Sequence, residues 1–304
     1  MSMDVRQLRY FLAVADAESF SKAAERLYIA QPSMSQAIAG LERELGVALF
    51  HRVGRGIVLS DAGRRLLAPA RQVIRDLATA QATVDAVRGI ASGRIDLITM
   101  PSPGIEPLSS IMQRFTGAYP EVTVSIDAAF VPDDVIDAVR TGAAEIGLLG
   151  APAAIQLADL AVTALEDQPL VLVTAPGGPF SDRSHITSAD LDGHRLIGSQ
   201  PGSLMRHLVD DILDRGVKAH LVAEVAHRTS ILPLVLAGVG DAILPSSWSD
   251  LARRAGADVL PIRPVSYLHI ALVSRRAQLT PAAQAFLTIA AGCGPSNNSE
   301  PPGP

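Results

Sequence analysis

The pattern of apolar and polar positions over the first sixty residues predicts short helices followed by a hairpin. Leu8, Phe11 and Val14 recur at intervals of three, so one face of a first helix is apolar. Ser19 precedes a second apolar-periodic segment at residues 21–27 and is a residue type that commonly caps helices. The sequence therefore predicts two helices close together in the chain.

A third helix is predicted over residues 31–45, after a tight link at residues 28–30. Pro32 falls in its first turn, where a missing N–H costs nothing, and Gly46 is a suitable C-terminal stop. Two helices joined by a three-residue turn form a helix-turn-helix. Residues 53–56 are glycine-rich and lie between two short apolar strands, which predicts a hairpin of the kind that forms a wing.

A long helix is predicted next, from Asp61 to about Ile90, with Ser60 as its cap. A small domain cannot bury its whole apolar stripe, so we expect it to pair with the same helix of a second chain. Packing against the winged region alone is the alternative. Pro69 lies inside this helix and either kinks or breaks it. The stripe comprises Leu66, Leu67, Ala70, Ile74, Leu77, Val84 and Val87.

After the long helix the pattern changes to short apolar strands that alternate with helices. Strands are predicted at 94–100, 122–128 and 146–150, with helices at 106–118 and 133–141 between them. Such alternation is typical of α/β folds with parallel sheets and right-handed crossovers. A second set comprises strands 169–174, 195–198, 222–225 and 242–244 with helices 203–215 and 230–237, and strand 268–273 and helix 281–291 return to the first set.

Charge divides the chain more clearly than composition does. The chain is 48% hydrophobic and 4% aromatic, which excludes a wholly disordered protein. Its net charge of -5 argues weakly against a nucleic-acid partner. Residues 1–94, however, contain 13 Lys and Arg against 9 Asp and Glu, and the remainder contains 13 against 22. This asymmetry indicates that the N-terminal part contacts a polyanion and the rest does not.

Cysteine content and apolar runs indicate the compartment. Cys293 is the only cysteine, so no disulfide can form within one chain, which fits a reducing cytoplasm. The N-terminal residues contain no apolar signal core, and we therefore expect a cytoplasmic protein. The apolar run at 231–239 is too short to span a bilayer, so no membrane partner is expected. Residues 294–304 are predicted to be a disordered tail from their composition.

A specific pattern of fixed spacings occupies residues 6–63. It contains F-x-x-V-A, S-F-S-x-A-A-x-x-L, A-Q-P-S-x-S-x-x-I-x-x-L-E-x-x-L-G, L-F-x-R and L-S-x-A-G. In this pattern the chain resembles the LysR-type transcriptional regulators. Weaker agreement continues at 119–126, 139–150 and 235–245, so that the resemblance covers nearly the whole chain.

The resemblance implies an α/β protein with an N-terminal winged helix-turn-helix, a long dimerisation helix and a two-lobed effector domain similar to type 2 periplasmic binding proteins. The partners it implies are double-stranded DNA with two operator half-sites, a small-molecule effector, a second or further copy of the chain in a dimer or tetramer, and RNA polymerase. No cofactor is implied. The chain should pass between the lobes near 165–170 and 261–267. The implied domains are 1–60 for DNA binding, 61–91 for the linker helix and 92–293 for the effector domain, in which 92–166 and 267–293 form lobe I and 167–266 form lobe II.

The resemblance also implies which residues contact DNA. A recognition helix places its N-terminal half in the major groove, where side chains contact base edges. Met34, Ile38 and Leu41 are spaced to face the core, which leaves Gln36 on the outward face as the best base reader because Gln can bond adenine twice. The expected DNA-binding residues are Ser21, Lys22, Gln31, Pro32, Ser33, Ser35, Gln36, Arg52 and Arg55.

Within this set the expected roles differ. Ser21 and Lys22 begin the second helix and should contact phosphate, whereas helix capping is the alternative role of Gln31, Ser33 and Ser35. Many LysR-type regulators carry basic residues where this chain has Gln36, Ala39 and Gly40. We therefore expect affinity for DNA to depend more on the wing arginines, Arg52 and Arg55.

The effector should bind between the lobes, where loop-to-helix junctions point inward. Ser102, Ser203 and Thr229 lie at such junctions and match positions where the resemblance places effector contacts, although helix capping is the alternative for each. Phe130, after the second strand, should form an apolar wall. Three hydroxyls together with helix dipoles favour a small organic anion as the effector.

Three other protein classes fit the residues less well. The chain has no G-x-S-x-G, H-E-x-x-H or phosphate-loop motif, and its 7 histidines show no ligand spacing, so we expect no enzyme, no catalytic residue and no metal site. Residues 238–240 lack the third glycine of a dinucleotide motif, and with Asp241 they fit a tight helix-to-strand turn better. A free solute-binding protein would not carry residues 1–60. A thiol switch would need a second cysteine beside Cys293.

Overall fold

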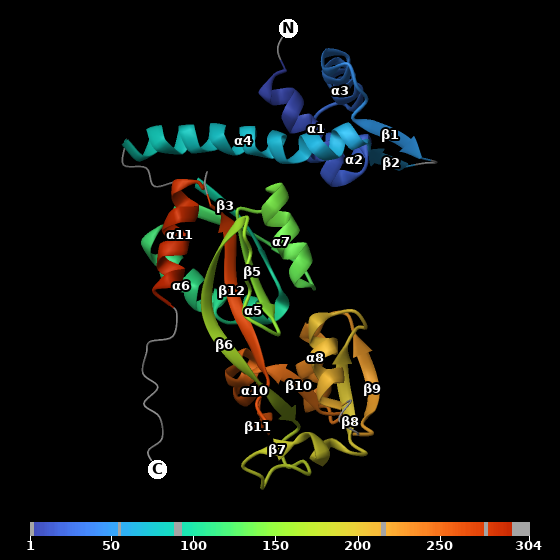
Figure 1. Cartoon of the computed structure of the whole chain (residues 1–304), viewed down its shortest axis with the longest axis vertical. Coiled ribbons are helices and arrows are strands. Elements are labelled where there is room, and N and C mark those ends of the chain that lie inside the picture. The colour runs from blue at the N-terminus through green and yellow to red at the C-terminus, as the bar shows by residue number, and fades with distance from the viewer. Residues whose placement is uncertain (1–2, 54–55, 88–92, 214–216, 277–278, 294–304) are drawn as a thin grey trace.

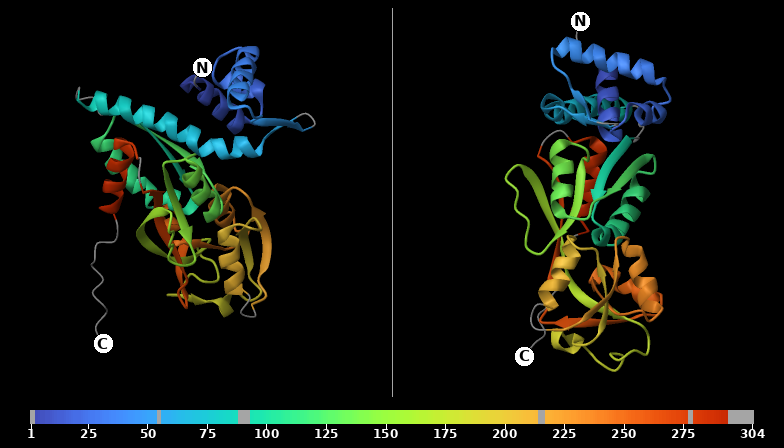
Figure 2. Two further views of the ribbon diagram at one scale, coloured as in Figure 1. Left: turned by 45° about the horizontal axis from the view of Figure 1, so that its top comes forward. Right: turned by 90° about the vertical axis from the view of Figure 1, so that its right-hand side faces the viewer.

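Three regions follow one another along the longest axis of the molecule (Figure 1). A computed structural model describes residues 3–53, 56–87, 93–213, 217–276 and 279–293. The winged region with the long helix lies at one end, lobe I is in the middle and lobe II forms the other end, as Figure 2 also shows. The predicted tail, residues 294–304, lies outside the described residues.

The winged region has the predicted elements with nearly the predicted ends. Ser19 caps the second helix by accepting a hydrogen bond from the backbone N–H of Lys22, and Gly46 ends the third helix with a φ of 70°. The hairpin pairs Phe50 with Leu59 and Arg52 with Ile57 in antiparallel register. The elements are α1 (Val5–Ala17), α2 (Phe20–Arg26), α3 (Gln31–Leu45), β1 (Phe50–Val53) and β2 (Gly56–Leu59).

The long helix, α4 (Asp61–Val87), completes the core of the winged region. Its Ala70 is buried among Phe11 and other residues of α1 and α3, and the aromatic rings of Phe11 and Phe50 pack at a centroid distance of 5.5 Å. Each fully buried side chain of the size of Phe11 contributes about 1.5–3 kcal/mol to the folded state. Removal of α4 would therefore expose the apolar face that holds α1 in place.

The apolar stripe of α4 is packed in the first part of the helix and exposed farther along it. Leu66, Leu67 and Ile74 pack against the winged core. In this half of the helix the stripe is therefore covered within one chain, which was the alternative to pairing with a second chain. Leu77, in contrast, is 45% exposed. The helix neither breaks nor ends at Pro69, which lies on its exposed side. The predicted end at Ile90 and the side chains of Val84 and Val87 lie outside the described residues.

Lobe I contains a five-stranded portion of the large sheet in the order β4-β3-β5-β12-β6, where β6 is the strand Leu160–Thr174. The predicted parallel pairs are present, since β3 lies between β4 and β5 and runs parallel to both. The strand β12 runs antiparallel to β5 and β6, so the expectation of parallel sheets holds for β3, β4 and β5 but not for β12. The elements are β3 (Gly93–Thr99), α5 (Pro101–Ile105), α6 (Leu108–Ala118), β4 (Val122–Ala128), α7 (Pro132–Thr141), β5 (Ile146–Ala151), β12 (Tyr267–Arg275) and α11 (Pro281–Ala291).

The predicted helix 106–118 is wrong at its start. A separate short helix, α5, occupies Pro101–Ile105, Glu106 is extended, and α6 begins only at Leu108. The interruption falls at Pro107, whose ring lacks the N–H that a continuous helix requires. Ser102, expected at a loop-to-helix junction, lies in the first turn of this short helix.

Lobe II contains a parallel pair, β8 with β9, and three strands that continue the large sheet. The segment 246–263, for which the sequence predicts no element, forms η3, α10 and β11. The predicted helix at 230–237 begins with a turn of 3-10 helix at Arg228. The elements are β7 (Ile186–Thr187), η1 (Ser188–Leu191), β8 (Arg195–Ser199), α8 (Leu204–Leu213), β9 (His220–Val225), η2 (Arg228–Ser230), α9 (Ile231–Leu236), β10 (Ala242–Pro245), η3 (Ser246–Trp248), α10 (Ser249–Arg254) and β11 (Asp258–Arg263).

One strand joins the two lobes. The 15 residues of β6 (Leu160–Thr174) pair antiparallel with β12 from Leu160 to Pro169 and with β10 and β11 from Leu170 to Thr174. The first predicted passage between lobes therefore occurs inside a continuous strand rather than in a loop. The second passage lies between β11 and β12, where Ser266 accepts a hydrogen bond from the backbone N–H of Leu170 at 2.8 Å.

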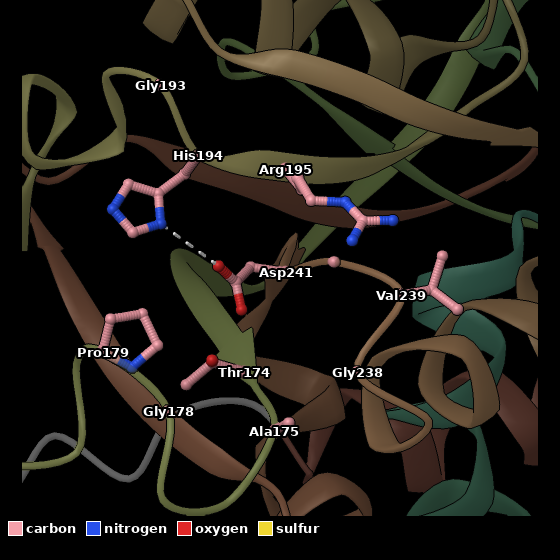
Figure 3. Close-up of a pocket in the computed structure, with 11 residues that line it drawn as sticks. Thr174, Ala175, Gly178, Pro179, Gly193, His194, Arg195, Gly238, Val239 and Asp241 are labelled. Carbon is pink, nitrogen blue, oxygen red and sulfur yellow. Dashed lines mark ion pairs between the residues drawn. The ribbon is translucent and has the colours of Figure 1, made fainter.

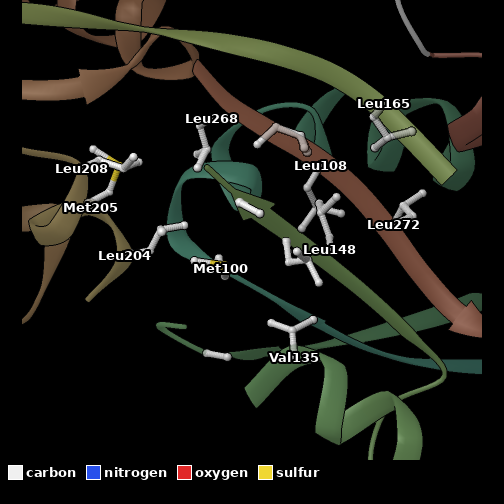
Figure 4. Packing of buried hydrophobic residues seen from close by; sticks show 14 of the residues in the cluster. Met100, Leu108, Val135, Leu148, Leu165, Leu204, Met205, Leu208, Leu268 and Leu272 are labelled. Atoms are coloured by element: carbon white, nitrogen blue, oxygen red, sulfur yellow. The ribbon is translucent and has the colours of Figure 1, made fainter. Parts of the chain in front are cut away.

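Apolar packing continues across the junction of the lobes. Met100 and Leu148 of lobe I belong to the same buried cluster as Leu204 and Met205 of α8 (Figure 4). Leu204 is 9% exposed and Met205 is 2% exposed. The first turn of α8 is therefore held against lobe I, although its helix belongs to lobe II.

The long helix is bonded to its neighbours on both sides. Arg71 donates to the carboxylate of Asp16 in α1 at 2.5 Å and to the hydroxyl of Thr141 in α7 at 3.4 Å. Arg75 donates to the carbonyl oxygen of Gly142 at 2.6 Å. Burial, with the nearby Arg275 guanidinium, lowers the pKa of Arg75 to about 10, so that it remains charged at neutral pH.

Steric crowding explains why the L-S-x-A-G motif ends in glycine at position 63. Gly63 donates its N–H to the Ser60 hydroxyl that caps α4, and a Cβ at this position would overlap the carbonyl oxygen of Leu49. We expect Gly63→Ala to lower the free energy of unfolding by about 1–3 kcal/mol through this overlap. Urea denaturation followed by circular dichroism measures the change.

Gly117→Ala is the matched control for this substitution. Gly117 lies inside α6, and a Cβ there would have nothing within 4 Å. Its substitution should leave stability unchanged or raise it by about 0.5–1 kcal/mol. Equal effects of the two substitutions would contradict the steric explanation.

Candidate functional site

The outward face of α3 consists of the residues expected there. Gln31, Pro32, Ser33 and Gln36 are exposed and Ser35 is half-buried. The core-facing residues are buried as predicted, at exposures of 0% for Met34, 2% for Ile38 and 0% for Leu41. The first turns of α3 therefore present an uncharged, hydrogen-bonding surface to solvent.

Gln31, Ser33 and Ser35 do not cap α3, which was their alternative role. The N-cap residue of α3 is Ala30, and no side chain caps the helix. Gln31 instead donates from Nε2 to the hydroxyl of Ser35 at 2.7 Å. The polar groups of these two side chains are thus held together one turn apart on the exposed surface.

The remaining residues expected at DNA lie on α2 and on the hairpin. Ser21 and Lys22 are exposed at the start of α2, and Arg52 is exposed on β1 of the hairpin. Arg55 lies outside the described residues. The described part of the wing therefore presents one exposed guanidinium to solvent.

Between the lobes, three side chains from three elements meet at the Ser102 hydroxyl. Ser102, in α5 of lobe I, is 0% exposed. Its Oγ accepts hydrogen bonds from Nη1 of Arg228 in η2 at 2.8 Å and from Nε1 of Trp248 in η3 at 3.4 Å. These bonds connect lobe I to lobe II directly.

Arg228 is a buried cation with spare donor capacity. It is 6% exposed, and its Nη2 is buried with no hydrogen-bond partner among the described residues. Burial lowers the pKa of Arg228 to about 10, so it remains charged at neutral pH. An unpaired donor on a buried cation costs several kcal/mol unless an anion or water satisfies it. The arrangement can bind one oxygen of a carboxylate.

The other expected effector residues have different surroundings. Ser203 is buried and caps α8, since its Oγ donates to the Gln200 carbonyl at 2.9 Å and accepts from the Arg206 N–H at 3.3 Å. Thr229 is exposed and directly follows Arg228. Phe130 is 38% exposed just after β4.

A cavity of about 410 Å³ lies within lobe II and contains none of these residues (Figure 3). Asp241 lines it, and its carboxylate lies 3.9 Å from Nδ1 of His194. Burial raises the pKa of Asp241 above the usual aspartate range. Gly238 has a φ of 71°, and the Asp241 N–H donates to the Arg195 carbonyl at 2.8 Å, so the predicted tight helix-to-strand turn is confirmed.

Neither a metal cluster nor a membrane-spanning helix is present among the described residues. No group of three or more His, Cys, Asp or Glu side chains in that part of the chain is arranged to hold a metal ion. No helix there has both the length and the apolar character needed to cross a membrane.

Sequence reasoning missed Arg228 and Trp248. Arg228 is adjacent to Thr229, which the sequence does indicate, but an arginine before a helix is usually on the surface. The available signal was that this arginine closely precedes the apolar run at 231–236. Trp248 is the only tryptophan, and nothing in its neighbourhood in the sequence connects it with Ser102.

Comparison with protein families matches two parts of the chain. Residues 5–64 match the family described as "Bacterial regulatory helix-turn-helix protein, lysR family". Residues 88–292 match the family described as "LysR substrate binding domain". The second match alone covers more than half of the 304 residues.

Individual relatives are similar over nearly their whole length. The HTH-type transcriptional regulator IlvR of Caulobacter vibrioides is 32% identical over 94% of this chain and 97% of its own. The HTH-type transcriptional regulator CbbR of Rhodospirillum rubrum is 31% identical over 94% of this chain and 96% of its own. The solved structure of a full-length OxyR variant from Pseudomonas aeruginosa has the same fold, with a TM-score of 0.72 at 24% identity over 96% of this chain and 95% of its own.

The cap at α8 can be tested by stability. We expect Ser203→Ala to lower the free energy of unfolding by about 1 kcal/mol, because the Arg206 N–H loses its acceptor. Ser110→Ala, at an exposed position of α6, should change it by less than about 0.5 kcal/mol. Urea denaturation of both variants decides the matter, and equal stabilities would mean that the Ser203 hydroxyl has no capping role.

Proposed function

The chain belongs to the LysR family of HTH-type transcriptional regulators, and on this basis we propose which residues bind DNA and what its C-terminal domain binds. It is a DNA-binding transcriptional regulator with an effector-binding domain, and its relatives are regulators rather than enzymes. Family membership alone does not identify the residues that contact DNA, nor does it identify the effector.

We propose that α3 enters the major groove with Gln36 reading a base edge. Support comes from the exposed, uncharged face formed by Gln31, Pro32, Ser33, Ser35 and Gln36, which is free of capping bonds. Phosphate contacts then fall to the remaining members of the expected set. These are Ser21, Lys22, Arg52 and Arg55.

The effector in this proposal is a small organic anion. The observation that carries it is the buried Nη2 of Arg228, a cationic donor without a partner among the described residues at the junction of the lobes. A carboxylate would accept from Arg228, with Ser102 and Thr229 as neighbouring hydroxyls. Ser203 and Phe130 are proposed to lie around the rest of the ligand, because Leu204, next to Ser203, packs against lobe I.

Self-association through α4 is proposed as well, in a dimer or a tetramer. Support comes from Leu77 and Val73, which are 45% and 41% exposed on a helix whose other face packs against the winged core. Such pairing would place two recognition helices on two half-sites of double-stranded DNA. RNA polymerase is the further protein partner proposed, on the family's role in transcription.

The anion proposal predicts a specific loss of binding. In a thermal-shift screen of small mono- and dicarboxylates, at least one compound should raise the melting temperature of the wild-type protein. Arg228→Gln should weaken binding of that compound about 10- to 100-fold, because a charged hydrogen bond is lost. Arg253→Gln, at an exposed position of α10, should bind it normally. A screen without any stabilising carboxylate would contradict the proposal.

The DNA proposal predicts different effects for the wing and the helix. Arg52→Ala should weaken binding to every sequence and lower the slope of log affinity against log salt by about 1, because one phosphate contact is lost. Gln36→Ala should leave that slope unchanged and reduce discrimination at one base position in each half-site by about 1–3 kcal/mol. Fluorescence anisotropy with labelled DNA over a salt series measures both, and an unchanged slope for Arg52→Ala would refute its phosphate contact.

A further inference from the structure

A second cavity between the lobes is lined mainly by acidic side chains. It has a volume of about 490 Å³ and is bounded by α5 and α6 of lobe I, by β6, and by η3 and α10 of lobe II. Glu106, Glu166, Asp167 and Asp250 line it, with Arg254 as the only basic residue among the lining residues. Asp167 is paired with Nδ1 of His269 at 2.6 Å. The described walls of the cavity therefore carry an excess of negative charge.

Gln168 at this cavity has a fixed orientation and an unused acceptor. Its Nε2 donates to the Glu106 carbonyl oxygen at 2.8 Å and to Oε1 of Glu166 at 2.6 Å. Because both partners only accept hydrogen bonds, the amide cannot be turned round without losing both bonds. Gln168 is 2% exposed, and its Oε1 is buried without a hydrogen-bond partner in the described part of the chain.

A second unsatisfied oxygen belongs to Ser247, which also lines this cavity. The hydroxyl of Ser247, on η3, is buried and also has no partner among the described residues. A buried polar atom without a hydrogen bond destabilises the folded protein, and a ligand that supplies the bond recovers this lost free energy. The residues that line the cavity thus combine excess negative charge with a buried amide oxygen that lacks a donor among the described residues.

We propose that this cavity binds a small organic cation with two ammonium groups. An ammonium group has three N–H donors and no acceptor, which matches the Gln168 oxygen and the carboxylates of Glu166 and Asp250. The described residues do not converge into a metal site, and the volume suits several non-hydrogen atoms better than a single ion. The proposed ligand has two ammonium groups so that one can pair with Glu166 and the other with Asp250 of lobe II.

The site shares no side chain with the proposed anion site and does not depend on it. Ser102 and Arg228 do not line this cavity, although α5 and η3 contribute residues to both places. Because both lobes and β6 form the walls, a bound cation stabilises the lobe arrangement in which the walls have this spacing. The cation and the effector would therefore both affect the arrangement of the two lobes, although they bind at different sites.

The test is isothermal titration calorimetry of the full chain with 1,4-diaminobutane at fixed ionic strength. The wild-type protein should bind the diamine, and Glu166→Gln combined with Asp250→Asn should weaken binding at least tenfold. Glu166→Gln keeps the oxygen that accepts from Gln168, and Asp250 is exposed, so this variant should melt at the wild-type temperature without ligand. That melting temperature verifies that it is folded.

Matched controls separate this site from general attraction to an acidic protein. Asp211→Asn, an exposed charge on α8, should leave the affinity for the diamine unchanged. The uncharged analogue 1,4-butanediol should not bind. Equal affinity in the double variant, equal weakening by Asp211→Asn, or binding of MgCl2 in place of the diamine would each overturn the proposal.

Discussion

The pairing of β6 is the constraint on which the rest of the C-terminal domain depends. One strand belongs to the sheet of lobe I up to Pro169 and to that of lobe II from Leu170. A shift of one residue in its register would turn every side chain of the strand to the opposite face in both lobes. The described chain passes between the lobes at this strand and at the neighbouring link between β11 and β12, so these two segments form the joint. Both the Ser102–Arg228 contact and the acidic cavity span that joint, so a ligand bound at either place would affect the same relative angle of the two lobes.

The long helix connects this joint to the DNA-binding region by direct bonds. Arg71 holds Asp16 of α1 and Thr141 of lobe I at the same time, and Arg75 holds the carbonyl of Gly142 at the end of α7. The core of the winged region is itself completed by α4. Charged hydrogen bonds and packed side chains thus connect lobe I to the winged region through α4, and such contacts resist deformation more than a loop would.

The candidate DNA surface was predictable from the sequence, whereas the interlobe site was predictable only in part. The face of α3 follows from helical spacing, because Met34, Ile38 and Leu41 specify which side is buried. Ser102 and Thr229 were identified from their junctions, but Arg228 was missed because its partner is 126 residues earlier in the chain. Gln168 has no distinguishing pattern at all. It was found only in the structure, where two acceptors fix the orientation of its amide and its Oε1 has no donor among the described residues.

Local interactions explain why the sequence by itself determined so much of this protein. Helix periodicity, the Ser19 cap, the Gly46 stop and the fixed spacings of residues 6–63 act over a few residues, and they specify the winged helix-turn-helix and the family. Tertiary structure alone decided the antiparallel course of β6 and β12, the division of the α4 stripe between packed and exposed residues, and the meeting of Ser102 with Arg228. These depend on contacts between distant segments, whose energies are set by burial and partner geometry in the folded chain. No spacing along the sequence encodes them.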